Sequence, residues 1–509
     1  MRNLCDKNNK NNKNNKNNNK NNKNLIKYFF ILSIIAFSLQ LAIAENEICE
    51  DIESISREYI CVEDMDEYEL INKENILNSM NNEEFNRFTF IKYNISNNMS
   101  QKSNNTTISV QSSVRMVRKV IEPINNEYYL SKENFSENKD YPYVINNPGK
   151  YYITEDIEKY PGICLNTSNV LIEGMGHLMT SNRSNATIAN AGITNLCGVS
   201  NITIQNYHVM DNNAGCAIRY GVYNITFINC STIDCNTGFL FQGAENLTFI
   251  NCNVSNCTNY GFAVSTTSHL DYENCYCNND YNQGFMFLLV DDISVKNSLI
   301  KYGGAGIYAA YCEDLVIENC KALNGSSGTY ILRTEDIVID NYDINNYLEA
   351  GLLLIITENV SIKNSDLNNN SINAHLAWME NAKLENNTFN NGIRGLYSDI
   401  INGHEDTHFK NITIVNNDFF NNTRYALSSE GTSENNWVYL NEFYNNSRLL
   451  NTMFMMGNYM NSPVINYTYN KKDYTGHLGN YYYDYTSEFK KSSNGIYQNP
   501  SFVYSEIDL

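Results

Sequence analysis

The residues best suited to metal chemistry lie close together late in the sequence. Two histidines and three acids, Asp399, His404, Glu405, Asp406 and His408, fall within one stretch of ten residues. Imidazole and carboxylate groups are suitable ligands for zinc and similar ions. We therefore predict that His404, Asp406 and His408 hold a metal ion. The alternative is a solvated polar loop, of which the same residues are also typical.

A second set of acids recurs at a regular distance. Asp291, Glu313, Glu335 and Glu358 follow one another at steps of 22 or 23 residues. At equivalent places in a stacked repeat, their carboxylates would stand about 5 Å apart and repel unless they are solvated or share cations. We predict these four residues as metal ligands, with calcium as the expected ion. The alternative is turn chemistry, in which an acid before a strand hydrogen-bonds the backbone.

A row of aromatic residues has the same spacing. Tyr308, Tyr330, His375 and Tyr397 recur once in each repeat or every second repeat, and Met286 and Leu353 occupy the equivalent places between them. If they point outward, these side chains can stack on sugar rings or on a partner surface. The alternative is that a terminal segment of the chain covers them.

The sequence contains no recognisable catalytic motif, and we predict no catalytic residue. Arg219, Arg333 and Arg394 are not paired with a set of acids by any motif, whereas polysaccharide lyases and hydrolases need convergent acid–base groups. We therefore favour a binding or adhesin-like protein that recognises carbohydrate or another cell-surface polymer. A polysaccharide-active lyase, hydrolase or epimerase is the alternative. A methionine-rich run at 453–460 suits Cu(I) or, alternatively, gap filling under a cap.

All these residues sit on a repeat of 22 or 23 residues. Its clearest mark is an alternating strand that ends in Asn, as in NITFIN (224–229), NLTFIN (246–251) and DIVIDN (336–341). A second short strand follows a Gly in each unit, as in GFLF (238–241) and GFMF (284–287). Such runs are too short for helices, and a fixed period indicates stacked units. The sequence therefore predicts an all-β fold, a parallel β-helix with two or three strands per coil.

Alternation along each strand predicts which side chains are buried. The inward positions of the first strand are pairs such as Ile225 and Phe227, and those of the second strand form a column that includes Phe239, Phe262 and Phe285. Stacked strands lie about 4.8 Å apart, which suits an aromatic stack. The repeated Asn side chains are expected to hydrogen-bond from coil to coil.

Both ends of the repeat resemble a known family. The opening stretch VINNPGKYYITEDIEKYPGICLNTSNVLIEGMGHLM begins at residue 144, and the closing stretches are YTGHLGNYYYDYTSEF (474–489) and NGIYQNPSFVY (494–504). They resemble the pectin-lyase-like right-handed β-helix proteins, and in particular the NosD-type family with its archaeal surface-protein relatives. The resemblance implies a right-handed helix and leaves a copper or metal accessory role as a further alternative.

The ends of the chain predict its organisation. Residues 1–44 combine a basic start, an apolar run and the small-residue site Ala42-Ile43-Ala44, which indicates a cleaved signal peptide and a secreted or cell-surface protein. We expect an acidic, then Asn/Ser-rich stalk or cap over 45–140, the β-helix over 141–465 and a capping segment over 466–509. No other segment is long and apolar enough to span a membrane. A net charge of −20 makes nucleic acid an improbable partner. Sequons recur, as at Asn201 and Asn224, which suits an exported glycoprotein.

The cysteines also fall in columns. Cys235 and Cys257 are 22 residues apart, so adjacent coils would bring their Cα atoms to about 4.8 Å, within the range for a disulfide. We predict a Cys235–Cys257 bridge. The alternative is a stack of buried thiols acting as small apolar side chains.

Overall fold

The computed structural model describes residues 126–136, 141–180, 191–278, 283–399, 409–430, 433–451, 458–469 and 471–483. The chain divides into two compact units, Asn24–Pro123 and the remainder, and the described residues all belong to the latter. The predicted signal peptide, and the predicted stalk up to residue 125, therefore lie outside the described residues.

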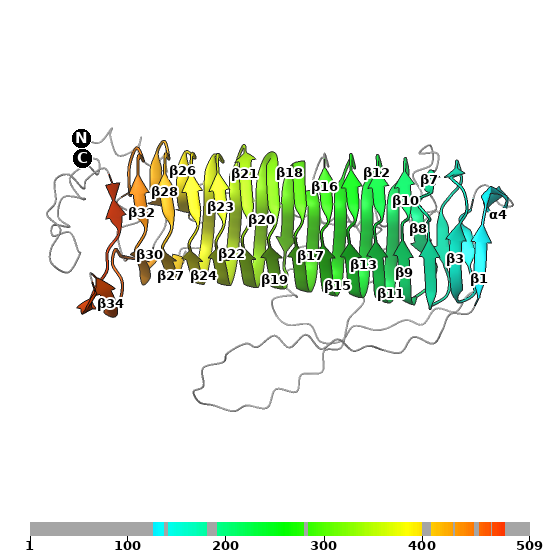
Figure 1. The fold of residues 1–509 in the computed structure, drawn as a ribbon, viewed down its shortest axis with the longest axis horizontal. Helices are drawn as coiled ribbons and strands as arrows, with labels where there is room; N and C mark the ends of the chain where they lie inside the picture. The colour runs from blue at the N-terminus through cyan, green and yellow to red at the C-terminus, as the bar shows by residue number, and fades with distance from the viewer. Residues whose placement is uncertain are drawn as a thin grey trace, which may run out of the picture. The chain divides into compact units, whose positions relative to one another are not determined.

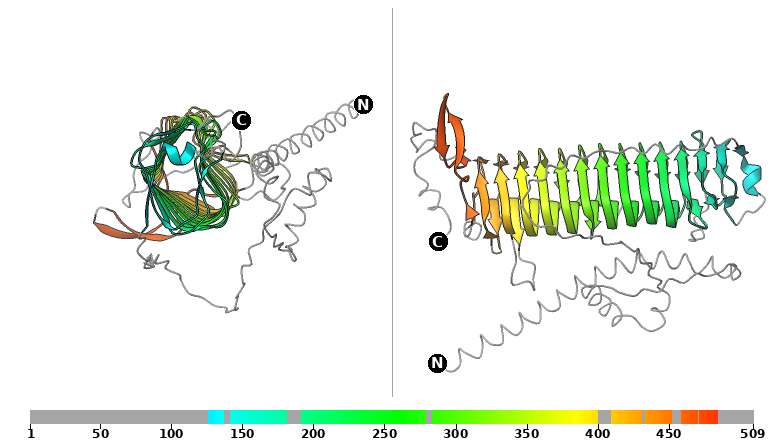
Figure 2. Two further views of the ribbon diagram at one scale, coloured as in Figure 1. Left: turned by 90° about the vertical axis from the view of Figure 1, so that its right-hand side faces the viewer. Right: turned by 90° about the horizontal axis from the view of Figure 1, so that it is seen from below.

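The described residues form an all-β, right-handed parallel β-helix of about 13 turns, as predicted (Figure 1). Each regular coil contains three strands. A three-residue strand alternates with a long one, and the long strand comprises the two segments recognised in the sequence, here called strand two and strand one in chain order. In β13 (Thr237–Ile250), strand two covers GFLF and strand one covers NLTFI. Viewed along the axis, equivalent strands of successive coils superpose (Figure 2, left).

The bounds of the strands follow this pattern of three strands per coil. The opening coils consist of β1 (Glu127–Leu130), α4 (Lys132–Ser136), β2 (Tyr143–Ile145), β3 (Gly149–Ile153), β4 (Ile157–Glu158), β5 (Ile163–Leu165), β6 (Val170–Glu173), β7 (Leu178–Thr180), β8 (Ala191–Asn195), β9 (Ser200–Gln205) and β10 (His208–Met210). The long strands, with their shorter fragments, are β11 (Ala214–Ile228), β13, β15 (Tyr260–Glu273), β17 (Gln283–Lys296), β18 (Leu299–Ala310), β19 (Glu313–Glu318), β20 (Lys321–Asp340), β22 (Ala350–Lys363), β24 (Ile372–Glu385), β26 (Arg394–Asp399), β27 (Phe409–Val415), β29 (Tyr425–Ser429), β30 (Ser433–Glu434) and β31 (Asn436–Tyr439). The short strands are β12 (Ser231–Ile233), β14 (Asn253–Ser255), β16 (Tyr276–Asn278), β21 (Asp343–Tyr347), β23 (Asp366–Asn368), β25 (Thr388–Asn390), β28 (Asp418–Phe420) and β32 (Glu442–Tyr444). The last elements are β33 (Asn458–Tyr459), β34 (Ile465–Tyr469), β35 (Lys472–Gly476) and β36 (Tyr481–Tyr482).

The core is a set of side-chain columns that run along the axis, and the predicted inward residues are buried. Phe262 is fully buried and stacks on Phe239 and on Phe285, each at 5.0 Å between ring centroids. A neighbouring column adds Phe249 and Tyr272, whose rings meet Phe262 edge-on. Offset stacks within a column and edge-to-face contacts between columns are both favourable geometries for aromatic rings.

Backbone corners separate the strands, and most of them are left-handed. The Asn at the end of strand one has a positive φ in each regular coil, for instance 53° at Asn229 and 55° at Asn274. Asn and Asp adopt this conformation at low cost, which explains why the sequence repeats them. The Asn side chains also hydrogen-bond from coil to coil as predicted, as from Asn229 Nδ2 to Asn206 Oδ1 at 2.7 Å.

The residue after this corner points inward and changes along the chain. It is Cys in several middle coils, as at Cys230, Cys252 and Cys275. In the last coils it is Asn, and we call Asn387, Asn417, Asn441 and Asn480 the inner asparagine ladder. The side-chain oxygens of Asn417, Asn441 and Asn480 each accept the backbone N–H of the preceding ladder residue at 2.8 to 3.1 Å, and that of Asn387 accepts the backbone N–H of Ser365 at 3.0 Å. Each of the amide groups of Asn387, Asn417, Asn441 and Asn480 also donates to a backbone carbonyl one coil back.

The two ends of the described helix are closed differently. At the N-terminal end, β1 pairs with β3, and α4 places Phe135 in the core, so the first described coil begins ahead of residue 141. At the other end, β36 pairs with β32 and Tyr482 stacks on Phe443. The β34–β35 hairpin is antiparallel and projects from the stack (Figure 2, left). No helix among the described residues is long and apolar enough to cross a membrane.

Candidate functional site

The predicted row of aromatic residues is a true column on strand two. We call Met286, Tyr308, Tyr330, Leu353, His375 and Tyr397 the strand-two column. The parallel register aligns each of them with the next, from β17 through β18, β20, β22 and β24 to β26. They alternate with inward residues such as Phe285 and Phe287, so they face the outside of the coil.

The strand-two column is less exposed than the sequence suggested. Tyr308 and Tyr330 are half-buried and meet edge-on at 5.2 Å, while Met286 and Tyr397 each retain only 6% exposure. The reason at Tyr397 is local packing, because the guanidinium of Arg394 lies 3.9 Å over its ring and the ring of His375 lies 4.8 Å away. Burial raises the pKa of Tyr308 and Tyr330, and that of Tyr397 to about 12, so these hydroxyls remain neutral hydrogen-bonding groups.

A second column flanks the first, and the sequence analysis missed it. Three residues after each of the first five strand-two column positions, the backbone turns left-handed at residues that are neither Gly nor Asn: Leu289, Tyr311, Arg333, Ile356 and Trp378. This conformation is unfavourable for bulky and β-branched side chains. Leu289 is 51% exposed, and the guanidinium of Arg333 lies 5.6 Å over the ring of Tyr311. The fixed offset of three residues is the sequence signal that would have found this column.

The C-terminal end of the strand-two column carries charged and titratable groups. We call His375, Arg394, Tyr397, Asp399 and Glu430 the C-terminal cluster. An Asp399 carboxylate oxygen lies 3.8 Å from His375 Nε2, and Arg394 pairs with Glu430 at 3.3 Å. Burial lowers the pKa of His375 although Asp399 opposes the shift, so the imidazole is neutral at pH 7.

This cluster changes the interpretation of two residues. No sequence motif pairs Arg394 with an acid, and the coil brings it to Glu430, 36 residues later. Asp399 was assigned to the long coil with the predicted metal ligands, whereas it ends β26 beside His375. The three predicted ligands His404, Asp406 and His408 lie outside the described residues. Ser428, aligned with Tyr397 in the next coil, is 1% exposed, and its hydroxyl has no hydrogen-bond partner among the residues that the structure describes.

The predicted acidic residues also form a column. The register aligns Asp291 with Glu313 and Glu335 with Glu358. Asp314 follows Glu313 at a left-handed corner, with φ of 50°. Burial, and then the neighbouring carboxylates, raise the pKa of Glu313 and of Asp314. The corner conformation supports turn chemistry, and the raised pKa values indicate repulsion along the column.

The described residues offer no ready-made metal centre. Within this part of the chain, no group of three or more His, Cys, Asp or Glu side chains is placed to hold a metal ion. The thiol of Cys230 lies inside the coil, and burial raises its pKa well above its usual value, which disfavours the thiolate form that binds metals. Cys235 and Cys257 are thiols in the structure, directed at the carbonyls of Ile233 and Ser255. A bridge between them remains a prediction.

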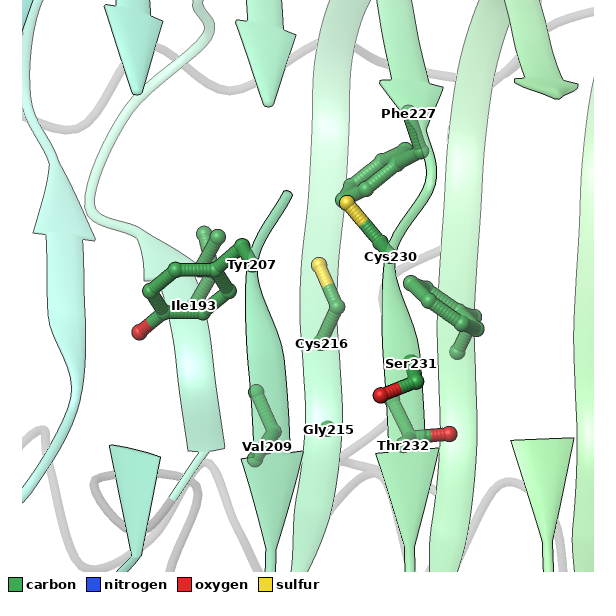
Figure 3. Close-up of a pocket in the computed structure, with 10 residues that line it drawn as sticks. Ile193, Tyr207, Val209, Gly215, Cys216, Phe227, Cys230, Ser231 and Thr232 are labelled. Atoms are coloured by element: carbon green, nitrogen blue, oxygen red, sulfur yellow. The ribbon is translucent and has the colours of Figure 1, made fainter. Parts of the chain in front are cut away.

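A small cavity inside the helix is too small for a ligand. Cys216, Cys230, Tyr207 and Thr232 are among its lining residues (Figure 3). Its volume is about 10 Å³, which leaves room for at most one water molecule.

Comparison with known proteins confirms the resemblance to the NosD-type right-handed β-helix. Residues 277–487 match the family model described as periplasmic copper-binding protein (NosD). A search of curated proteins found no match.

Several solved structures are similar at low identity. The A-module of the Azotobacter vinelandii mannuronan C-5 epimerase AlgE6 is 14% identical, with a TM-score of 0.37, over 66% of this chain and 89% of that one. The periplasmic alginate epimerase AlgG is 13% identical, with a TM-score of 0.33, over 63% and 83%. Tailspike protein 3 of bacteriophage CBA120 is 12% identical, with a TM-score of 0.32, over 64% and 55%. None of these identities is high enough to carry function across.

Proposed function

With a NosD-type right-handed β-helix as the scaffold, we propose that this chain binds a polysaccharide along the strand-two column. The observation that carries the proposal is the register, which stacks six apolar or aromatic side chains on the outer face without a break. Tyr side chains join an apolar ring to a hydrogen-bonding hydroxyl, and sugars present both kinds of surface. The flanking Tyr311 and Trp378 widen the aromatic surface beside the column.

The N-terminal segment bears on the cellular location of the protein. We propose that residues 1–44 direct export and that the mature chain works outside the cytoplasm, where polysaccharides are available. The family model that matches residues 277–487 describes a periplasmic protein, and this supports a location outside the cytoplasm.

Binding can be tested with paired aromatic variants. Tyr308→Ala/Tyr330→Ala removes two rings of the column, and Phe420→Ala/Tyr444→Ala is the matched control, because these rings form a half-buried stack on the short-strand face. Two lost ring contacts at about 0.5–1.5 kcal/mol each predict a roughly 5- to 150-fold weaker affinity. Affinity electrophoresis against a panel of neutral and acidic polysaccharides gives the measurement. Equal losses in both double variants, or no binding to any polymer, would contradict the proposal.

A second candidate is catalysis on the bound polymer, and the C-terminal cluster favours it. A neutral imidazole beside a tyrosine and an aspartate is suited to proton transfer. New reducing ends, or a changed ring stereochemistry in the polymer, would reveal the activity. His375→Gln should abolish it, while the part of the binding that Tyr308 and Tyr330 provide persists. Turnover should fall as the pH drops below the pKa of His375, which burial holds under its ordinary value. An unchanged polymer after prolonged incubation would leave binding alone.

A further inference from the structure

The arginines of the described residues are unevenly placed. All five of them, Arg219, Arg333, Arg394, Arg424 and Arg448, lie on strand two or on a corner next to it. The lysines of the regular coils, such as Lys363 and Lys410, lie instead on strand one or the short strand, next to acids. In a chain with a net charge of −20, this places the guanidinium groups on the face that we propose for binding.

Three of these arginines are gathered at the C-terminal end of that face. Arg394 is aligned with Tyr425 in the next coil, and Arg448 follows one coil later, where it donates to the Tyr425 hydroxyl at 2.9 Å. The guanidinium of Arg448 lies 5.6 Å from the Tyr425 ring centroid, and that of Arg424 lies 5.7 Å from the same centroid. Arg394 stacks on Tyr397 at 3.9 Å. Two tyrosine rings thus support three guanidinium groups.

This arrangement suits an anion more than it suits internal ion pairing. A guanidinium group stacked on an aromatic ring is held in a limited set of orientations, so less entropy is lost when it binds. Its fork of N–H donors matches a carboxylate in a bidentate manner. Glu430, whose side chain is 56% exposed, pairs with Arg394, whose side chain is only 12% exposed, so this pair is held more firmly than a surface ion pair. Arg424 and Arg448 are exposed, and they are the guanidinium groups that an anion reaches first.

We propose that Arg394, Arg424 and Arg448 bind the carboxylate groups of an acidic polysaccharide whose rings lie on the strand-two column. This inference rests on the proposed polysaccharide binding and narrows its ligand to a polyuronate. The acidic column lies on a different corner of the coil, before strand one, so it leaves the arginine end of strand two as the place where a polyanion can approach. The neutral His375 adds no positive charge there at pH 7.

The test compares polymers that differ only in charge. Three polyuronates with different ring stereochemistry are each paired with their methyl ester, which keeps the backbone and blocks the carboxylate. Wild-type chain should bind at least one polyuronate about tenfold or more tightly than its ester. The triple variant Arg394→Gln/Arg424→Gln/Arg448→Gln should lose that difference. Arg219→Gln, an arginine on the same strand several coils away, is the control and should keep it.

The outcomes separate this inference from the function on which it rests. Equal affinity for acid and ester, or an acid preference that survives in the triple variant, overturns the arginine site and leaves the aromatic binding face standing. Binding to no polymer of any kind overturns both. Circular dichroism of the triple variant should match the wild-type β spectrum, and Arg394→Lys, which keeps the charge but not the fork, should retain only part of the preference.

Discussion

The inner asparagine ladder makes a strong prediction at Asn417. This side chain is fully buried, and its Oδ1 accepts the backbone N–H of Asn387 at 2.8 Å while its Nδ2 donates to the carbonyl of Leu384 at 2.9 Å. Asn417→Ala leaves both backbone groups without these partners inside the core. A buried unsatisfied group costs about 1–3 kcal/mol, so the variant should lose roughly 2–6 kcal/mol of the free energy of unfolding.

A serine in place of Asn417 separates the contributions of these two hydrogen bonds. Ser365 occupies this column two coils earlier, where its hydroxyl accepts the backbone N–H of Tyr342 at 3.1 Å. Asn417→Ser should therefore satisfy the N–H of Asn387 but not the carbonyl of Leu384, and it should lose about half as much stability as Asn417→Ala.

Equilibrium unfolding in guanidinium chloride measures both values. Fluorescence of Trp437, in the next coil, should be compared with the far-ultraviolet circular dichroism of the whole chain, because a repeat array can lose its end coils separately. A loss below about 1 kcal/mol for Asn417→Ala, or equal losses for Ala and Ser, would refute the assignment of stability to these hydrogen bonds.

Four further predictions concern the core, Asp314 beside the acidic column, the acidic column itself and the thiols. Phe262→Ala removes a fully buried ring from the stack and should cost about 3–5 kcal/mol in the same denaturation assay; a cost under about 1 kcal/mol would contradict the core assignment. Burial raises the pKa of Asp314 in the folded state above its value in the unfolded chain. The contribution of Asp314 to the free energy of unfolding is therefore fully present below the unfolded-state pKa, and it is lost as the pH rises through the folded-state pKa. Asp314→Asn should thus raise the free energy of unfolding at pH 7 by roughly a few tenths of a kcal/mol after solvent screening, seen as a higher melting temperature, and have no effect in strong acid; a lower melting temperature at pH 7 would argue for a structural role of the charge. If calcium bridges the column, millimolar Ca²⁺ should raise the wild-type melting temperature, and an unchanged value leaves turn chemistry. Peptide mapping without reduction should recover Cys235 linked to Cys257, and alkylation of both would exclude the bridge.

The fold could be predicted from the sequence because each repeat carries two independent signals for it. Alternation within each strand identified Phe262 and its stacking partners as core, and the recurring Asn marked a corner that requires a left-handed residue. The same pattern in NWVYLN (436–441) predicts Asn441 at the exposed corner, and this prediction is wrong. Leu440 occupies the corner, with φ of 57°, and Asn441 belongs to the inner asparagine ladder.

The candidate site was predictable only in part. Spacing alone placed Tyr308, Tyr330, His375 and Tyr397 in one column, since a fixed period maps directly onto stacking. The pairing of Arg394 with Glu430 depends on the irregular coil between them, whose length breaks the period. Exposure was overestimated at Tyr397, because alternation predicts which way a side chain points but not which neighbours cover it.

Because the strand-two column is in parallel register, equivalent contact positions recur on the outer face once per coil. The four half-buried positions from Tyr308 to His375, at about 4.8 Å per coil, give a track of about 14 Å, because Met286 and Tyr397 at the ends of the column each retain only 6% exposure. A polymer can occupy such a track in several frames, each shifted by one coil, so short oligosaccharides gain from the number of equivalent frames while longer ones gain from the number of simultaneous contacts. Affinity should therefore rise with oligosaccharide length until the ligand spans the track, and then level off. A ligand held in this way can move by single-coil steps without leaving the protein.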